Sequence, residues 1–375
     1  MRQLTWTEEA GWASDGAAPP TSPASLALVF GDREALGSPT ALAELGDRFP
    51  GAIVVGCSTA GQIRGASVID RCIVATVVGF EQTRVATATV KATGGDSRAA
   101  GRRLAEQMVA PDLAHVLVFS EGIDINGSEL VRGLGDSLPA EVTVTGGLAA
   151  DGERFGETLV VCGRELCTHG IAAVGLYGTS LRVGYGSFGG WDPFGPERLV
   201  TRADRNVLFE LDGQSALALY KTYLGEHAQR LPASGLLFPL SLRVDDAAPV
   251  VRTILAIDEA AQSMTFAGDI PEGGYVRLMK ANFDRLIDGA AEAGRISGDR
   301  LRGSRPDLAL LISCVGRRMV LRQRVEEEVE AALEAIGAGT TATGFYSYGE
   351  ISPFTPSARC ELHNQTMTIT TLSER

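Results

Sequence analysis

Tyrosine, serine and glutamate side chains gather in residues 344–353, the segment of the chain richest in groups that could orient a ligand. Tyr346, Tyr348 and Glu350 alternate along this segment, and Ser347 lies between the two tyrosines. Successive side chains of a β-strand point to opposite faces of the sheet. We therefore expect the two tyrosines and the carboxylate on one face, where they could line one wall of a binding pocket.

A run of polar residues follows at His363, Asn364, Gln365 and Thr366, in a segment expected to enter a strand. A buried polar group without a partner costs about 1–3 kcal/mol, so a strand seldom carries such a run unless something satisfies it. Two interpretations remain open. These side chains contact a ligand, or the backbone of a neighbouring turn satisfies them.

Catalysis would require a nucleophile with its base, a metal site or a phosphate cradle, and the sequence offers few candidates. Tyr346, Glu350, Cys360 and His363 could form an acid–base set in a cleft, which is the weaker hypothesis. Cys360 and His363 have the spacing C-x-x-H, but side chains three apart on a strand point to opposite faces. We expect no metal centre there and interpret Cys360 as a buried thiol. The sequence predicts a non-catalytic binding protein.

Cys57 and Ser58 lie in a corner bounded by glycines, residues 56–61. This corner lacks the lysine of a P-loop and the glycine spacing of a dinucleotide fingerprint, which favours a close-packed structural corner over a nucleotide site. Cys57 and Ser58 remain candidate ligand contacts. Arg317, which follows a predicted strand, could bind a carboxylate, although a lone arginine at a strand end is more often a surface or interdomain contact.

A strand–helix–strand pattern that ends in a glycine-rich corner occurs three times. The first strands and the corners they lead to are 26–30 and 56–61, 116–119 and 146–152, and 308–312 and 344–353. Gly147 and Asp151 belong to the second corner, and strand-like runs follow each corner. The helix before the third corner is expected to turn Glu326–Glu328 away from its apolar side. The pattern predicts an α/β fold of repeated βαβ-type units with added antiparallel strands, forming two domains around a shared cleft.

The chain divides into three predicted regions. Residues 1–24 have little apolar periodicity and are expected to be a flexible N-terminal arm. Residues 191–196 are rich in turn-forming residues and resemble a crossover between domains. We therefore expect one domain at 25–205 and a second at 206–375.

The formal net charge of -12 argues against a nucleic-acid partner or an anionic membrane surface, because either requires clustered lysine and arginine. No apolar run approaches the ~18 residues of a spanning helix, so we expect no membrane insertion and a cytoplasmic location. The 6 cysteines are spread along the chain without a C-x-x-C pair, which favours free thiols.

Several segments together resemble the FIST proteins. They are 144–152, 231–239, 279–283, 314–318, 344–353 and 360–366. The resemblance runs from about Leu26 to Leu372 in the order of the family's two domains. It implies that 25–205 is a FIST N-terminal domain and 206–375 a FIST C-terminal domain.

This resemblance implies an intracellular sensory module that binds a small ligand, such as an amino-acid-like metabolite, and takes part in signal transduction. Its partner would be a separate signalling enzyme, such as the histidine kinase of a two-component system. Some FIST proteins bind haem and sense nitric oxide, which gives an alternative function for this chain. Haem would need an axial ligand, for which His363, His169 and His115 are the candidates.

Matching the family's motifs to this chain adds a set of expected ligand-facing positions. They are Tyr346, Ser347, Tyr348, Gly349, Glu350, His363, Asn364, Gly147 and Asp151. Together with Cys57, Ser58 and Arg317, these are the candidate ligand-binding residues.

Overall fold

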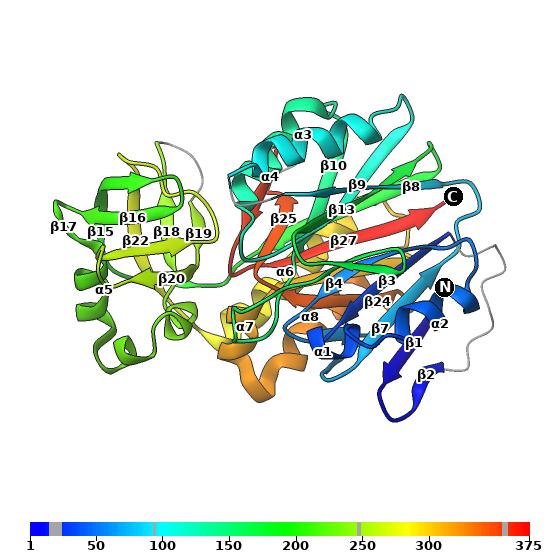
Figure 1. The fold of residues 1–375 in the computed structure, drawn as a ribbon, viewed down its shortest axis with the longest axis horizontal. Helices are drawn as coiled ribbons and strands as arrows, with labels where there is room; N and C mark the ends of the chain where they lie inside the picture. The colour runs from blue at the N-terminus through cyan, green and yellow to red at the C-terminus, as the bar shows by residue number, and fades with distance from the viewer. Residues whose placement is uncertain (15–24, 93–94, 246–248, 355–358) are drawn as a thin grey trace.

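The computed structural model describes residues 1–14, 25–92, 95–245, 249–354 and 359–375. The fold is a mixture of α and β structure, as the sequence predicts, and it consists of a body and a smaller lobe of residues 192–280 (Figure 1). None of the described helices is both long and apolar enough to span a membrane. All 6 cysteines are free thiols, which confirms that prediction.

The body contains the three predicted units. The elements of the first are β3 (Leu26–Gly31), α1 (Arg33–Leu36), α2 (Ala41–Arg48), β4 (Ile53–Ser58), β5 (Gln62–Arg64), β6 (Ser67–Ile69), β7 (Ile73–Val78) and β8 (Arg84–Lys91). Helix α3 (Ser97–Met108) leads to the second. Its elements are β9 (Leu113–Ser120), α4 (Gly127–Ser137), β10 (Thr143–Leu148), β11 (Val160–Cys162), β12 (Glu165–Cys167), β13 (Gly170–Tyr177) and β14 (Leu181–Phe188).

Helix α6 (Phe283–Asp299) leads to the third unit. Its elements are β23 (Leu308–Cys314), α7 (Val315–Leu321), η3 (Arg322–Arg324), α8 (Val325–Ile336), β24 (Thr341–Ser347), β25 (Gly349–Pro353), β26 (Cys360–His363) and β27 (Met367–Glu374). Asn282 begins α6 by accepting a hydrogen bond from the Arg285 N–H, at 3.3 Å.

The same local geometry recurs in the three units. In each unit the strands before and after the helix pair in parallel, as β3 with β4, β9 with β10, and β23 with β24. The corner glycines Gly56, Gly146 and Gly344 press against the neighbouring parallel strand, where an added Cβ would lie 1.7, 1.9 and 1.8 Å from a carbonyl oxygen. Only glycine permits this approach, which explains why the sequence repeat is marked by glycine.

The units exchange hairpins in a cycle. Strand β5 of the first unit pairs with β24 of the third, β11 of the second pairs with β4 of the first, and β25 of the third pairs with β10 of the second. Two N-terminal strands, β1 (Arg2–Thr7) and β2 (Gly11–Ser14), extend the first of the resulting sheets. The sheets have the orders β12-β11-β4-β3-β7-β1-β2, β26-β25-β10-β9-β13-β8 and β14-β27-β23-β24-β5-β6. Each unit therefore completes the sheet of another.

The centre of the body is apolar. Phe30, Phe119 and Phe345, one from each unit, lie in mutual contact with ring centroids 4.7–6.2 Å apart. All three rings are fully buried. This packing joins the three sheets at one point.

The described part of the N-terminal segment is ordered, so the expectation of a flexible arm is wrong for residues 2–14. Strand β1 (Arg2–Thr7) pairs with β7, and β2 (Gly11–Ser14) pairs with β1. The buried side chains of Leu4, Trp6 and Trp12 explain the order, because each removes a large apolar surface from water. Residues 15–24 of the predicted arm lie outside the described residues.

The lobe forms its own eight-stranded sheet. Its elements are β15 (Asp192–Asp204), β16 (Val207–Leu211), β17 (Gln214–Ser215), α5 (Ala216–Leu224), η1 (Gly225–Arg230), η2 (Ala233–Leu237), β18 (Leu240–Arg243), β19 (Val250–Arg252), β20 (Ile254–Asp258), β21 (Ser263–Phe266) and β22 (Tyr275–Lys280). The predicted boundary between residues 205 and 206 falls inside this lobe, between the paired strands β15 and β16.

Candidate functional site

The carboxylate of Glu350 is fully buried at the start of β25. Ser347 Oγ donates to its Oε1 at 2.5 Å, and the backbone N–H and hydroxyl of Thr366 donate to its Oε2 at 3.2 and 3.0 Å. Burial raises the pKa of Glu350 to about 8, and these hydrogen bonds oppose the rise. The groups that donate hydrogen bonds to this carboxyl, from Ser347 and Thr366, are all neutral.

Tyr346 belongs to a second buried group. Its hydroxyl donates to Glu328 Oε1 at 2.7 Å, and Arg317 Nε donates to Glu328 Oε2 at 2.9 Å. The other two nitrogens of Arg317 donate to the backbone oxygens of Gly189 and Leu286, at 2.5 and 2.6 Å. Arg317 is therefore an internal ion-pair partner in this structure.

Glu328 is absent from the sequence-based candidates, and its predicted orientation is wrong. It lies on α8, and its side chain has no exposed surface. Its spacing carried a signal: it falls three residues after Val325 and four before Ala332, on the helix face that packs inward.

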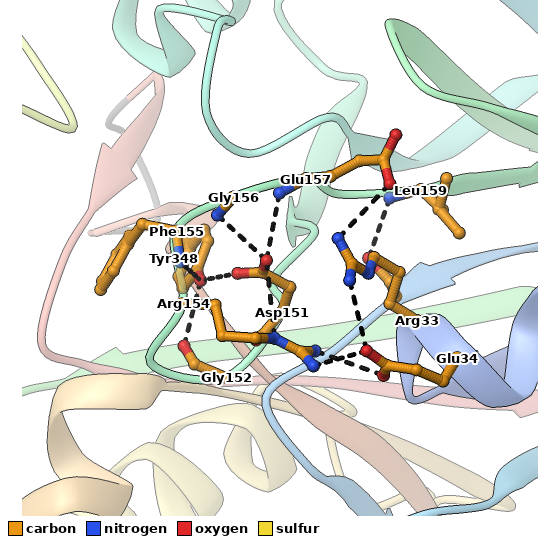
Figure 2. Close-up of polar contacts among 11 residues, drawn as sticks. Arg33, Glu34, Asp151, Gly152, Arg154, Phe155, Gly156, Glu157, Leu159 and Tyr348 are labelled. Carbon is orange, nitrogen blue, oxygen red and sulfur yellow. Dashed lines mark hydrogen bonds and ion pairs between the residues drawn. The ribbon is translucent and has the colours of Figure 1, made fainter.

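Tyr348 and Asp151 meet in a third group, although they are far apart in the sequence (Figure 2). The Tyr348 hydroxyl donates to Asp151 Oδ1, and the backbone N–H groups of Gly156 and Glu157 donate to Oδ2 at 3.0 and 3.1 Å. The Phe155 ring stacks on Tyr348 with centroids 4.5 Å apart. Burial raises the pKa of the Tyr348 hydroxyl, and Asp151 raises it further.

Ion pairs connect this third group to the first unit. Arg154 donates to the Asp151 backbone oxygen at 2.8 Å and pairs with Glu34 at 2.5 Å, while Arg33 pairs with Glu157 at 3.4 Å (Figure 2). The loop after the second corner is thereby fixed to α1. The sequence offered no sign of this connection.

The polar run after β26 contacts both body and lobe. Asn364 Nδ2 donates to the Tyr348 backbone oxygen, and Asn364 Oδ1 accepts from the Thr253 N–H, both at 3.3 Å. Gln365 Nε2 donates to the Leu236 backbone oxygen and the Thr253 hydroxyl, both at 3.1 Å. Backbone groups of the body and the lobe thus partner both amide atoms of Asn364 and the nitrogen of Gln365, whereas the buried Gln365 Oε1 has no hydrogen-bond partner among the described residues.

The remaining candidates are buried packing residues. Ser58 Oγ accepts from the Leu159 N–H at 2.9 Å, and burial raises the pKa of the Cys57 thiol. Gly147 and Gly349 lie on the paired strands β10 and β25, where an added Cβ would come within 2.9 Å of a neighbouring side chain.

The three histidines proposed as axial ligands, His115, His169 and His363, do not suit haem ligation. Both ring nitrogens of buried His115 contact threonine hydroxyls, at 2.6 and 3.0 Å, and burial lowers its pKa to about 3. His363 Nε2 contacts the Ser352 backbone oxygen at 2.9 Å, while half-exposed His169 pairs with Asp124 at 3.2 Å. All three lie outside the linings of the two cavities described below. None of these three histidines therefore offers an unengaged ring nitrogen beside either cavity.

No group of three or more His, Cys, Asp or Glu side chains suited to a metal ion occurs among the described residues. The ring nitrogen of His363 and the thiol of Cys360 have separate partners, since Cys360 Sγ donates to the Val144 backbone oxygen at 3.2 Å.

A cleft of about 530 Å³ lies beside these groups and is called the Arg318 cleft. Its charged lining residues are Asp70, Glu153, Arg230, Arg318 and Arg322, and its larger apolar lining residues are Leu237, Val315, Met319 and Val325. The cleft thus lies between η2 of the lobe and α7 of the body. None of the sequence-based candidates is in its lining, but Gly152 and Arg318 directly follow the candidates Asp151 and Arg317.

The electrostatics of the cleft depend on Arg318. Its Nη1 and Nη2 pair with Asp70 at 2.9 and 2.5 Å, and its guanidinium lies 5.7 Å from the centre of the Tyr346 ring. The exposed Arg322 guanidinium has no hydrogen-bond or ion-pair partner among the described residues. The cleft therefore presents both signs of charge beside an apolar surface.

Comparison with known proteins identifies two family domains. The model of the FIST N domain matches residues 25–214, and the model of the FIST C domain matches residues 216–353. The predicted boundary between 205 and 206 thus lies inside the first matched range.

Relatives of this chain occur in bacteria and archaea. An uncharacterized protein of Mycobacterium tuberculosis is 28% identical over 238 residues, which cover 60% of this chain and 59% of the relative. Another from Mycobacterium bovis is 26% identical, covering 60% of this chain and 58% of the relative. An uncharacterized protein of Methanocaldococcus jannaschii is 21% identical, covering 79% and 64%. The matches thus span less than two thirds of each relative's own length.

Proposed function

The chain belongs to the FIST family, whose domains are associated with sensory signal transduction, and from this premise we propose that it binds a small amino-acid-like metabolite in the Arg318 cleft and regulates a separate signalling partner. The observation that carries the proposal is the combination of both charge signs with an apolar surface in one cleft.

The ligand class follows from the lining of the cleft. An amino acid presents a carboxylate and an ammonium group a few ångströms apart, so its site needs both a cationic and an anionic side chain. Arg322 is available to the carboxylate and Glu153 to the ammonium group, while Asp70 is already paired with Arg318. Leu237, Met319 and Val325 would receive the side chain, which favours an apolar amino acid.

The buried groups have a positioning role in this proposal. Tyr346 lies beneath Arg318, and the Arg317–Glu328 pair holds the start of α7, from which Arg318 and Met319 project. Asp151 and Tyr348 fix the loop that carries Gly152 and Glu153. These candidates from the sequence thus hold in place the helix and the loop that carry cleft-lining residues, without lining the cleft themselves.

The signal would pass through the junction between lobe and body. The cleft has Arg230 and Leu237 on the lobe side and Arg318 and Met319 on the body side. A ligand that contacts both sides favours the orientation of the lobe in which both contacts form. A histidine kinase or another signalling enzyme that contacts the lobe would respond to that shift.

We propose further that the protein is non-catalytic. Tyr346, Glu350 and His363, the residues of the enzymatic alternative, make their hydrogen bonds in separate buried groups. A haem-dependent nitric oxide sensor is not proposed, since the candidate axial ligands are engaged elsewhere or lie away from the cavities.

A thermal-shift screen with the L-amino acids and small carboxylates tests the proposal. A ligand that binds only the folded state raises the unfolding midpoint by mass action. We expect leucine, valine or methionine to give the largest shift and aspartate or lysine little. A flat response across the whole panel would remove the proposed ligand class.

A further inference from the structure

A second cavity, of about 830 Å³, lies on another part of the junction between body and lobe. Helix α4 and strand β26 of the body form one side, and strands β18 and β19 of the lobe form the other. It is called the Arg252 cavity after the buried arginine in its wall. None of the residues proposed to contact the amino acid lines it.

Arg252 is buried with 8% of its surface exposed. Its Nε donates to the Asp269 backbone oxygen at 3.2 Å, and its Nη1 donates to the backbone oxygens of Val251 and Leu362 at 3.3 and 3.1 Å. These acceptors are neutral carbonyls. No hydrogen bond from Nη2, and no ion pair of Arg252, occurs among the described residues.

The nearby carboxylate of Asp269 is already engaged. Its Oδ1 accepts from Asn126 Nδ2 at 2.9 Å, and its Oδ2 pairs with Arg132 at 2.5 Å. Burial lowers the pKa of Arg252 to about 10, so the guanidinium stays charged at neutral pH. A buried charge without a counter-ion is costly, and proteins usually pair such groups. Arg252 therefore brings to the cavity wall a buried positive charge that has no ion pair among the described residues, and only the more distant charges of Asp269 and Glu361 favour its charged form.

We propose that the Arg252 cavity binds a small monocarboxylate with an apolar body, and that Arg252 is its counter-ion. Val131, Leu242, Val250 and Leu362 supply the apolar wall. The lining also holds equal numbers of opposite charges, the carboxylates of Asp136, Glu141, Asp269 and Glu361 and the guanidinium groups of Arg98, Arg132, Arg252 and Arg359. A dianion such as phosphate would therefore add more unbalanced negative charge than a monocarboxylate does.

A bound carboxylate would strengthen the contact between lobe and body. Arg252 of the lobe already donates to Leu362 of the body, and Arg132 of the body pairs with Asp269 of the lobe. An anion beside Arg252 adds a charge-assisted hydrogen bond at this junction. The site is distinct from the Arg318 cleft, so its existence does not depend on the proposed function.

Calorimetric titration of the full chain with hexanoate tests the proposal, with hexanamide as the uncharged analogue and inorganic phosphate as the dianion. We expect saturable binding of hexanoate, and weaker or no binding of the other two. In Arg252→Gln, the affinity for hexanoate should fall about tenfold or more, since a charge-assisted hydrogen bond is lost.

A second variant blocks the cavity without touching Arg252. Gly135 lies in the lining, and an added Cβ there would meet no heavy atom within 4 Å, so Gly135→Phe should fold and fill the space. Its matched control is Gly298→Phe, at an equally open helical glycine outside the cavity. Arg277→Gln is the control for the arginine, because Arg277 also lies in the lobe sheet and donates to a backbone oxygen.

Hexanoate binding that is lost in Arg252→Gln and Gly135→Phe but kept in the two controls would support the site. The proposal is overturned if hexanoate does not bind, if phosphate binds in preference, or if Gly135→Phe binds hexanoate as tightly as the wild type. Because amino acids are absent from this titration, its result is separate from that of the thermal-shift screen.

Discussion

Two buried arginines of this molecule have opposite surroundings. Arg317 in the body pairs with Glu328 and donates to two backbone oxygens, so each of its three nitrogens has a partner. Arg252 in the lobe has only neutral partners and faces a cavity. The first arrangement is complete without a ligand, whereas the second lacks a negative charge.

This difference distinguishes polar residues that stabilise the fold from polar residues that could bind a ligand. The conspicuous polar residues near the third corner, Tyr346, Ser347, Tyr348 and Glu350, resemble Arg317, because each has a partner inside the protein. The arginines without an ion pair among the described residues, Arg252 and Arg322, lie instead at the junction with the lobe. The strongest tests therefore compare substitutions in these two settings.

Glu328→Gln should give the largest loss of stability. It removes the counter-ion of Arg317 and leaves a buried charge unpaired, which costs about 3–5 kcal/mol of unfolding free energy. Urea unfolding measures the loss. Glu327→Gln is the matched control, since Glu327 lies next to it on α8 and pairs with Arg324 at the surface, and we expect no measurable loss there. Equal effects in both variants would show that the buried pair is not a framework element.

Glu350 should make stability depend on pH. Its pKa lies near 8 in the folded state against about 4.5 ordinarily, so the folded state holds a proton that the unfolded state releases between these values. Stability should therefore fall as pH rises from about 4.5 to 8, by up to about 1.4 kcal/mol per pH unit. Comparing unfolding of the wild type and Glu350→Gln across this range isolates the contribution. A variant with an unchanged slope would mean that Glu350 is ionised in the folded protein.

Tyr348→Phe should have an intermediate effect. The buried Asp151 carboxylate would lose one partner but keep the N–H groups of Gly156 and Glu157, so we expect a loss of about 1–3 kcal/mol in unfolding free energy. Thermal and urea unfolding report this loss. Tyr223→Phe, which removes a hydroxyl that contacts Arg198 in the lobe, serves as the control and should cost less.

Arg252→Gln should change stability least among the buried sites. The lost hydrogen bonds are offset by removal of a buried charge that has no ion pair among the described residues, so we expect a change within about 1 kcal/mol. Urea unfolding without carboxylate measures it. A loss as large as that of Glu328→Gln would place Arg252 with Arg317 as a framework residue.

The repeat and the α/β class could be predicted from the sequence, because both depend on local patterns. Gly56, Gly146 and Gly344 mark equivalent positions, each pressed against a neighbouring strand. The hairpin exchange could not be predicted, since pairs such as β5 with β24 join distant residues. The order of residues 2–14 also depends on distant contacts, although the alternation of Leu4 and Trp6 was a local signal.

None of the candidate ligand-binding residues from the sequence lines either of the two cavities. Residues 344–353 do gather buried polar groups, but sequence cannot tell a side chain with an internal partner from one that faces a cavity. The spacing of Glu328 along α8 is that of an inward-facing residue, but its charge led to the prediction of an outward-facing one. Arg252 carried none, because a single arginine at the end of a short strand looks like any exposed residue.

Ligand binding in the Arg318 cleft is tested most directly by calorimetric titration with the amino acid that gives the largest thermal shift. The titration compares the wild type, Arg322→Glu and Arg302→Glu, where Arg302 is an exposed arginine with the same positive φ of 51° but outside the cleft. We predict equal affinities for the wild type and Arg302→Glu, and an affinity about tenfold lower for Arg322→Glu, because the reversed charge repels the ligand's carboxylate. Equal binding by all three proteins would contradict the assignment of the ligand to this cleft.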